Sequence, residues 1–245
     1  MMLDGLQVVL VKTRFPENIG MAARACVNMG CPKLCLVAPE RRDRERAAPL
    51  ATPKGRGLLE AATVCGSLEE AVAASHLVVG TTARTGGWRN DIVLPGQAAA
   101  EIARTLARGE RVSLVFGPED RGLENREISR CQRLVSIPVE RDAPSLNLAQ
   151  AALLMLYECA GAVRALRADP SAPKMRDGHA LTAEELERLL ARFKETLLAL
   201  DCLHGDNPDY FFMSWRRLFG RIGLKRHEYD ALMGLCRQID NMRQR

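Results

Sequence analysis

Several enzyme classes leave short local signatures, and this sequence contains few of them. No G-x-G-x-x-G follows the first apolar run, which argues against a Rossmann dinucleotide site and against the glycine loop of Rossmann-type methyltransferases. No G-x-S-x-G nucleophile elbow occurs either. The four histidines are scattered, and no His/Cys cluster has the spacing of metal ligands, so we expect no bound metal.

Disulfide signatures, membrane spans and aromatic residues are also missing or scarce. None of the eight cysteines belongs to a C-x-x-C pair, which favours reduced, buried thiols. No apolar run is long enough to cross a membrane, and Asp4 stands where a signal peptide would be basic, so we expect a cytoplasmic protein. Aromatics make up only 4% of the chain, which weighs against a recognition surface built mainly on stacked bases.

What remains is the composition of a globular protein, with 47% hydrophobic and 27% charged residues among 245. Up to about residue 165, short apolar runs alternate with helical patterns, and runs that are apolar throughout predict strands buried on both faces. We therefore predict an α/β domain whose parallel sheet of about six strands is covered by helices. The strands are expected at 6–12, 33–39, 62–66, 76–82, 111–117 and 133–139.

A change of composition divides the chain. We predict a first domain over 1–165, a linker over 166–181 that is interrupted by prolines and a glycine, and an all-helical module over 182–245. Thr182 and Glu185 form an S/T-x-x-E pattern that predicts the start of the first helix of this module. The leucines that follow at helical spacing predict its buried face.

The C-terminal module also contains a basic segment, residues 215–227, which carries five Arg and Lys residues and no acid before Glu228. One interpretation is a phosphate-binding surface, which the net charge of +5 permits. The alternative is a solvated helix face beside buried Trp215, Leu218 and Phe219.

Ligands of open α/β sheets bind beyond the carboxyl ends of the strands, and two strand-to-helix loops there stand out early in the chain. The loop after the first strand carries Asn18 and Arg24, nearly two turns apart, so one helix face could present both; an Asn cap followed by an exposed Arg is the alternative. The loop at 78–85 carries two threonines whose hydroxyls can bond either a ligand or the turn itself.

Two later loops are more informative. Gly117 and Gly122 bracket Glu119, which suggests backbone close to a bound molecule or an ordinary tight turn. Ser145 and Asn147 stand before a long apolar helix, whose capping needs only one of them.

Three segments together carry a family resemblance: "NIGMAAR" (18–24), "LVFGPEDRGLEN" (114–125) and "SIPVERDAPSLNLAQAALLMLYE" (136–158). Their order and spacing resemble the three motifs of the SpoU/TrmH branch of the SPOUT RNA methyltransferases. The C-terminal helices also resemble the tail of a tRNA 2'-O-methyltransferase of that family, so the resemblance covers nearly the whole chain.

The resemblance implies a C-terminal trefoil knot, a homodimer and S-adenosyl-L-methionine as methyl donor for a ribose 2'-hydroxyl. The catalytic positions that match are Arg24, Asn18, Glu119, Ser145 and Asn147. The cofactor-binding positions that match are Thr81, Thr82, Ala83, Gly117, Ile137, Ser145, Leu146 and Asn147. Contacts with RNA are expected from Arg24, Arg216, Arg217, Arg221, Lys225 and Arg226.

The expected substrate is tRNA, at nucleotide 32 of the anticodon loop. Two departures from the common pattern bear on this: Met21 replaces a small residue, and "DAPSLN" lacks an aromatic that can precede Ser-Leu-Asn. The alternatives are the same chemistry on ribosomal RNA and a knotted RNA-binding protein without catalysis, which would have no need of all five catalytic positions. A nucleotide-dependent oxidoreductase is a further alternative that lacks its glycine fingerprint.

Overall fold

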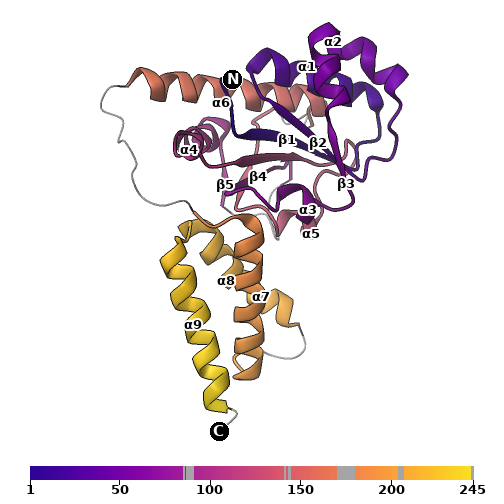
Figure 1. Cartoon of the computed structure of the whole chain (residues 1–245). Helices are drawn as coiled ribbons and strands as arrows, with labels where there is room; N and C mark the ends of the chain where they lie inside the picture. The colour runs from indigo at the N-terminus through magenta and orange to yellow at the C-terminus, as the bar shows by residue number, and fades with distance from the viewer. Residues whose placement is uncertain are drawn as a thin grey trace. The chain divides into compact units, whose positions relative to one another are not determined.

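The structure is a computed structural model that describes residues 1–84, 86, 91–140, 142, 145–169, 180–203 and 207–243. The chain divides into two compact units, Met1–Met175 and Arg176–Arg245 (Figure 1). Each unit has its own hydrophobic core. We describe the two units separately.

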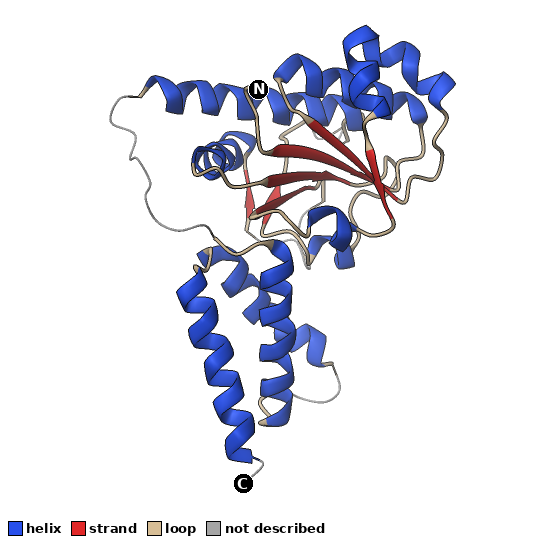
Figure 2. Cartoon of the chain, in the orientation of Figure 1, coloured by secondary structure: helices blue, strands red, loops and turns tan. Residues whose placement is uncertain are grey.

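The first unit is built on a parallel sheet, whose strands are red in Figure 2. The strand order is β3-β2-β1-β6-β4-β7-β5. Its strands are β1 (Leu6–Val11), β2 (Lys33–Val37), β3 (Thr63–Cys65), β4 (Leu77–Thr81), β5 (Ile92–Val93), β6 (Val112–Phe116) and β7 (Arg133–Val135). All six predicted strands are confirmed. The short β5 was not predicted, because two residues carry no periodic pattern. The last predicted strand is shorter than expected, since β7 ends at Val135.

Six helices of the first unit cover the sheet: α1 (Pro16–Met29), α2 (Arg44–Glu60), α3 (Leu68–Val72), α4 (Pro95–Ala107), α5 (Asn125–Ile128) and α6 (Leu148–Ala168). In Figure 1, α1, α2, α4 and α6 lie over one face of the sheet, and α3 and α5 lie over the other. Helix α1 packs against both α2 and α6. With helices over both faces, β1 and β6 are almost fully buried, as their continuous apolar runs predict.

Helix α2 was not predicted, because Pro49 and Pro53 interrupt the helical pattern in its sequence. It consists of two helical segments joined at a kink, where Thr52 has φ 64° and ψ 164°. Asp43 caps its start by accepting hydrogen bonds from the amides of Glu45 and Arg46. Proline can occupy the first turn of a helix without losing a hydrogen bond, so Pro53 directly after the kink can start the second segment.

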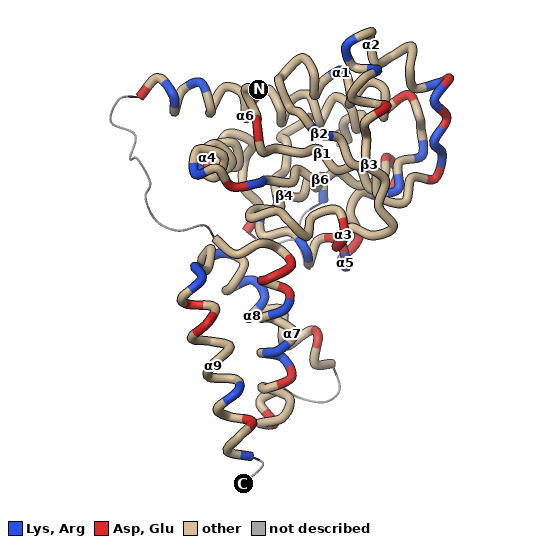
Figure 3. Tube along the Cα trace, in the orientation of Figure 1, with Lys and Arg blue, Asp and Glu red and all other residues tan. Residues whose placement is uncertain are grey.

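The second unit consists of α7 (Ala183–Ala199), α8 (Pro208–Ile222) and α9 (Arg226–Arg243). The predicted start of α7 is confirmed, with a capping box between Thr182 and Glu185. Helix α7 packs against α8 and α9 through a core that contains Leu189 and Phe219. Acidic and basic residues both occur along α7 and α9 (Figure 3).

Two expectations about this part of the chain were wrong. Helix α6 continues to Ala168, past residue 166 where the linker was expected to begin; the stretch 170–179 lies outside the described residues. Trp215 is 37% and Leu218 is 38% exposed, so of the three apolar residues that the solvated-face interpretation of the basic segment placed in the core, only Phe219 is buried. The trefoil knot stays a prediction. Among the described residues, no helix is long and apolar enough to cross a membrane.

Candidate active site

Three loops meet beside the sheet because β6, β4 and β7 are neighbours and run in the same direction. Their carboxyl ends therefore lie at one edge, where the loops enclose a cavity of about 440 Å³. Both apolar and polar side chains line the cavity. Its lining is Thr81, Thr82, Ala83, Arg84, Phe116, Gly117, Pro118, Glu119, Asp120, Arg121, Gly122, Leu123, Val135, Ile137, Val139, Ser145, Leu146, Leu148 and Ala151.

All the residues expected to bind the cofactor line this cavity except Asn147. The two threonine hydroxyls also bond the protein itself. Thr81 Oγ1 donates to the carbonyl of Val115 at 3.1 Å, and Thr82 Oγ1 donates to the carbonyl of Arg84 at 2.9 Å. These two bonds fix the loop after β4. Its residues are therefore already positioned at the cavity before a ligand binds.

Three of the expected catalytic residues form one hydrogen-bonded chain. The Asn18 amide donates to Glu119 Oε1 at 2.6 Å. The Asn147 amide donates to Asn18 Oδ1 at 2.8 Å, and Asn147 Oδ1 accepts from the backbone amides of Ala149 and Gln150 at 2.9 and 3.3 Å. The structure thus connects the segments that follow β1, β6 and β7, from the cavity edge to the start of α6.

Asn18 is not a helix cap, contrary to the alternative interpretation. Phe15 occupies the N-cap position of α1, and Pro16 and Glu17 are its first two residues. Asn18 is only 4% exposed, and both its side-chain amide and its oxygen are used in the chain described above. A buried amide needs such partners, because an unsatisfied one costs about 1–3 kcal/mol.

Arg24 lies apart from this chain. It is an exposed residue of α1 and does not line the cavity. Six residues separate it from Asn18, which places the two side chains about 120° apart around the helix axis. The expectation that one helix face presents both residues was therefore wrong.

The loop between Gly117 and Gly122 is a tight turn. A Cβ on Gly117 would lie 2.3 Å from the carbonyl carbon of Gly122 and the amide nitrogen of Leu123, so only glycine fits there. Gly122 has φ +62°, which also favours glycine. Glu119 Oε2 accepts the backbone amide of Arg14 at 3.1 Å, which holds the tip of the turn. The close approach at Gly117 is thus made by the turn's own backbone, while both glycines line the cavity.

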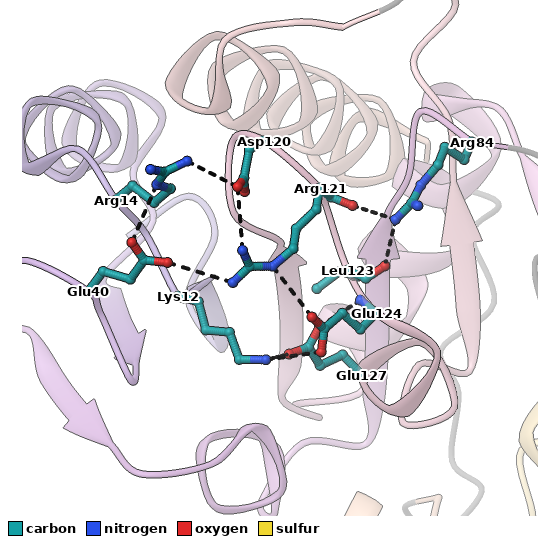
Figure 4. A network of polar contacts seen from close by, with 9 residues as sticks. All are labelled: Lys12, Arg14, Glu40, Arg84, Asp120, Arg121, Leu123, Glu124 and Glu127. Carbon is teal, nitrogen blue, oxygen red and sulfur yellow. Dashed lines mark hydrogen bonds and ion pairs between the residues drawn. The ribbon is translucent and has the colours of Figure 1, made fainter.

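A network of charged residues holds the outer side of this turn (Figure 4). Glu40 bridges two guanidinium groups, with 3.3 Å to Arg14 and 3.6 Å to Arg121. Asp120 contacts the same two groups at 3.0 and 3.4 Å. Exposed pairs of this kind contribute little singly, but a closed ring restrains the turn from several directions.

Lys12 extends this network at the end of β1. Its ammonium group contacts Glu127 at 2.9 Å and Glu124 at 3.2 Å, and the hydrogen bond to Glu127 raises the pKa of Lys12. The sequence did not predict that this network would contain Lys12, Arg14, Glu40 and Arg121. No local pattern could have found them, because the partners lie up to about a hundred residues apart.

Arg84 was also missed, although it follows the expected cofactor residues directly. Its guanidinium donates to the carbonyl of Arg121 and, at 3.4 Å, to that of Leu123 (Figure 4). It therefore joins the loop after β4 to the loop after β6 across the cavity. The "TTAR" sequence contained a signal, because an arginine directly after the expected cofactor residues can connect their loop to a neighbouring loop.

Two of the basic residues expected to contact RNA are engaged within the helical unit. Both guanidinium ends of Arg216 bond the carboxylate of Glu187, and Arg226 pairs with Glu185 at 2.6 Å. Arg217 and Lys225 are half-buried and Arg221 is exposed. Within the described residues, no group of three or more His, Cys, Asp or Glu could hold a metal ion.

Known proteins resemble the chain over its whole length. It is 37% identical to the tRNA (cytidine/uridine/adenosine-2'-O-)-methyltransferase TrmJ of Pseudomonas aeruginosa, covering 98% of this chain and 96% of that protein. The tRNA (cytidine/uridine-2'-O-)-methyltransferase TrmJ of Escherichia coli is 32% identical, with the same coverage. The crystal structure of TrmJ from Z. mobilis superposes with a TM-score of 0.80 at 28% identity, covering 96% of this chain and 98% of the other.

A model of the SpoU rRNA Methylase family matches residues 5–157, which include the first two motifs, the third without its last residue, and every residue that lines the cavity. The sheet order, the loop cavity and the hydrogen-bonded chain of Glu119, Asn18 and Asn147 lie within that match. The chain belongs to the SpoU rRNA Methylase family.

Proposed function

We propose that this protein transfers a methyl group from S-adenosyl-L-methionine to a ribose 2'-hydroxyl of RNA, and that its substrate is tRNA. The observation that carries the proposal is the chain from Glu119 through Asn18 to Asn147, which joins three family motifs at the edge of a cavity. The relatives named as tRNA 2'-O-methyltransferases support the substrate. Nucleotide 32 of the anticodon loop is the target that the resemblance implies.

The residues around the cavity fit S-adenosyl-L-methionine. A volume of about 440 Å³ is within the range of small-molecule sites, and its wall contains apolar side chains such as Ile137 and Leu148. The backbone of 81–83, Gly117, Ser145 and Leu146 would hold the polar parts of the cofactor. The bound cofactor supplies a methyl group already activated on a sulfonium, so the protein mainly has to align the ribose.

We assign alignment of the ribose to Ser145 and Asn147. Asn147 is fixed by two backbone amides and by Asn18, so its position is determined before the substrate binds. Glu119 holds Asn18 and, through the amide of Arg14, the start of α1.

The 2'-hydroxyl must lose a proton as the new bond forms. An arginine side chain stays protonated in proteins at any physiological pH, so Arg24 is a poor base. We assign to Arg24 a clamp on the target phosphate whose positive field favours the alkoxide. The proton then leaves to phosphate or water.

For this role Arg24 must reach a cavity of this kind. Within a single chain, however, Arg24 does not line the cavity. We propose a homodimer in which Arg24 of one copy serves the cavity of the other. The outer side of α6 supports the pairing, since Leu153, Leu154 and Tyr157 are 38%, 43% and 58% exposed there. Exposed apolar residues clustered on one helix are typical of a contact surface.

The test is to incubate the protein with labelled S-adenosyl-L-methionine and total RNA and to map the labelled nucleotide. Label on a ribose of tRNA is expected. Label on ribosomal RNA would keep the chemistry and replace the substrate, whereas label on a base would contradict the proposal. RNA binding without any label would favour a non-catalytic binding protein. The free state of all eight cysteines suits action in the reducing cytoplasm.

A further inference from the structure

Arg24 on α1 and Lys54 on α2 are two exposed cations whose backbones are neighbours. Helices α1 and α2 pack against each other (Figure 1). At this contact, a Cβ on Gly55 would lie 3.4 Å from both the Cα and the amide nitrogen of Arg24. Lys54 directly precedes Gly55 in the chain. Both side chains are long and flexible, so from these positions they can reach one ligand.

The surroundings of the two cations lack acidic residues. Helix α1 carries no acid after Glu17, and α2 carries none between Glu45 and Glu60. Glu17 lies two turns before Arg24 and pairs with Arg46 at 2.6 Å. Helix α6 also packs against α1, and its one acid, Glu158, faces α4, where a Cβ on Gly96 would lie 3.8 Å from its carboxylate. No element packed here therefore supplies a counter-charge.

The side chains of Arg24 and Lys54 have no hydrogen-bond or ion-pair partner within the described part of the chain. Other exposed arginines of the same unit do have acidic partners, as Arg46 has Glu17 and Arg126 has Glu69. Two unpaired cations at neighbouring positions repel each other. An anion bound between them would replace this repulsion by two attractions.

A strained residue precedes Lys54 at the kink of α2. Thr52 has φ 64° and ψ 164°, and a non-glycine residue in such a conformation costs about 1–3 kcal/mol. Strain of this size persists only where the surrounding structure imposes it, and it is concentrated at functional sites. Here α2 changes direction at Thr52 and meets the backbone of Arg24 through Gly55 three residues later. The strain thus lies where Lys54 is set beside Arg24.

We propose that Lys54 and Arg24 together bind a phosphate of the RNA substrate. Lys54 is then the second cation of the phosphate clamp assigned to Arg24, which deepens the proposed function and rests on it. The two residues belong to the same copy of the chain, whichever cavity Arg24 serves. Arginine binds phosphate through its planar fork of donors and lysine binds it as a point charge, so the pair surrounds one phosphate from two sides.

An ordinary solvated surface is the alternative to a phosphate site. The arginines at the start of α2 fit that alternative, because Arg42 and Arg44 alternate with Asp43 and Glu45 along the chain. Lys54 differs from them, since no acid lies within five residues of it on either side. The favoured ligand is therefore an anion, and the RNA backbone is the anion that the proposed reaction supplies.

The experiment uses the full-length protein and measures the binding of unfractionated tRNA over a series of salt concentrations. Lys54→Gln removes the charge, and Lys54→Arg keeps it. Lys33→Gln is the matched control, because Lys33 is an exposed lysine at the start of β2, at the opposite end of the sheet from the cavity. Thermal denaturation of each variant accompanies the binding measurement.

We expect Lys54→Gln to bind tRNA about tenfold more weakly at low salt and to reduce the slope of affinity against salt by about one contact. Lys54→Arg and Lys33→Gln should behave as the wild type. Equal losses in Lys54→Gln and Lys33→Gln would show a general effect of charge and overturn the inference, as would unchanged binding by Lys54→Gln. A fall in thermal stability of Lys54→Gln would assign a structural role to Lys54 instead.

The outcomes for this inference and for the proposed function are distinguishable. Binding needs no methyl transfer, so Lys54→Gln remains informative if the wild type binds tRNA without methylating it. A wild type that binds no tRNA would overturn the proposed substrate together with this inference. Equal binding by the wild type and Lys54→Gln would overturn the inference alone.

Discussion

The side-chain amide of Asn147 donates to the side-chain oxygen of Asn18 across 2.8 Å, although 129 residues separate them in the chain. The bond connects the start of α6 to the first turn of α1, and Glu119 completes it on the other side. Two helix starts and one loop are thereby held in one geometry beside the cavity.

The first prediction separates this bond from helix capping. In Asn147→Asp the carboxylate still accepts from the amides at the start of α6, where a negative charge is favourable, so α6 should stay capped and stability should fall only by about 1–3 kcal/mol, the cost of the lost bond to buried Asn18. The variant cannot donate to Asn18, and the methyl-transfer rate should fall about tenfold or more, equal to about 1.4 kcal/mol of transition-state stabilisation. Rates at saturating cofactor and urea denaturation give the two readouts. A variant as active as the wild type would show that the bond is dispensable.

The second prediction concerns Arg84. Arg84→Met removes the donor to the carbonyls of Arg121 and Leu123, so the loops on either side of the cavity should separate. We expect the affinity for S-adenosyl-L-methionine, measured by calorimetry, to weaken about tenfold, within the range of one lost charge-assisted hydrogen bond. Arg126→Met is the control, because Arg126 is an exposed arginine that pairs with Glu69 and does not line the cavity. Equal effects in both variants would contradict a special role for Arg84.

The third prediction tests whether Arg24 acts in the other copy of the proposed homodimer. Arg24→Ala should abolish methyl transfer while cofactor affinity stays nearly intact. When Arg24→Ala is mixed with Asn147→Asp and the copies are allowed to exchange, each mixed dimer should contain one intact site. Activity should then recover to about a quarter of the wild-type value, since about half the dimers are mixed. A mixture that stays inactive would place Arg24 and Asn147 in the same copy.

The fourth prediction concerns the contact between α1 and α2. A Cβ on Gly20 would lie 2.0 Å from the backbone oxygen of Ala47, so Gly20→Ala must push the two helices apart. We expect the free energy of unfolding to fall by about 1–3 kcal/mol. On α2, a Cβ on Gly57 would meet no atom within 4 Å, so Gly57→Ala should be neutral or slightly stabilising. Thermal denaturation of both variants distinguishes a steric effect from a general loss of glycine.

The fifth prediction compares Arg216 and Arg221, two arginines of α8. Arg216→Met leaves Glu187 without its half-buried partner, so the helical unit should lose about 1–3 kcal/mol of stability, visible as faster hydrogen exchange in α7. Arg221→Gln should reduce the slope of RNA affinity against salt by about one contact. A flat salt response in the wild type would contradict phosphate binding by this helix.

Local signals in the sequence were sufficient for much of the fold. The continuous apolar runs of β1 and β6 predicted buried parallel strands, because both faces of such a sheet are covered. The Thr182 capping box located the start of α7, since its hydrogen bonds join residues three apart. The loops that line the cavity were recognised because strand ends, glycines and polar residues occur together there.

Local patterns failed where the outcome depends on distant neighbours. The kink at Thr52 lets α2 continue across two prolines, and Trp215 remains exposed although its helical spacing suited the core. Whether an amphipathic residue is covered depends on which helices pack beside it, and no window of sequence contains that information.

The sequence by itself determined the six longer strands, the starts of α6 and α7 and the residues of the three motifs, because these depend on neighbours a few positions away. Only the tertiary structure decided how the motifs meet. It brought Asn147 into a hydrogen bond with Asn18 and the Arg84 guanidinium into contact with the loop after β6. It also left Arg24 outside the cavity. The reason is that these contacts join segments brought together by the packing of the whole sheet, whose order places β6, β4 and β7 side by side.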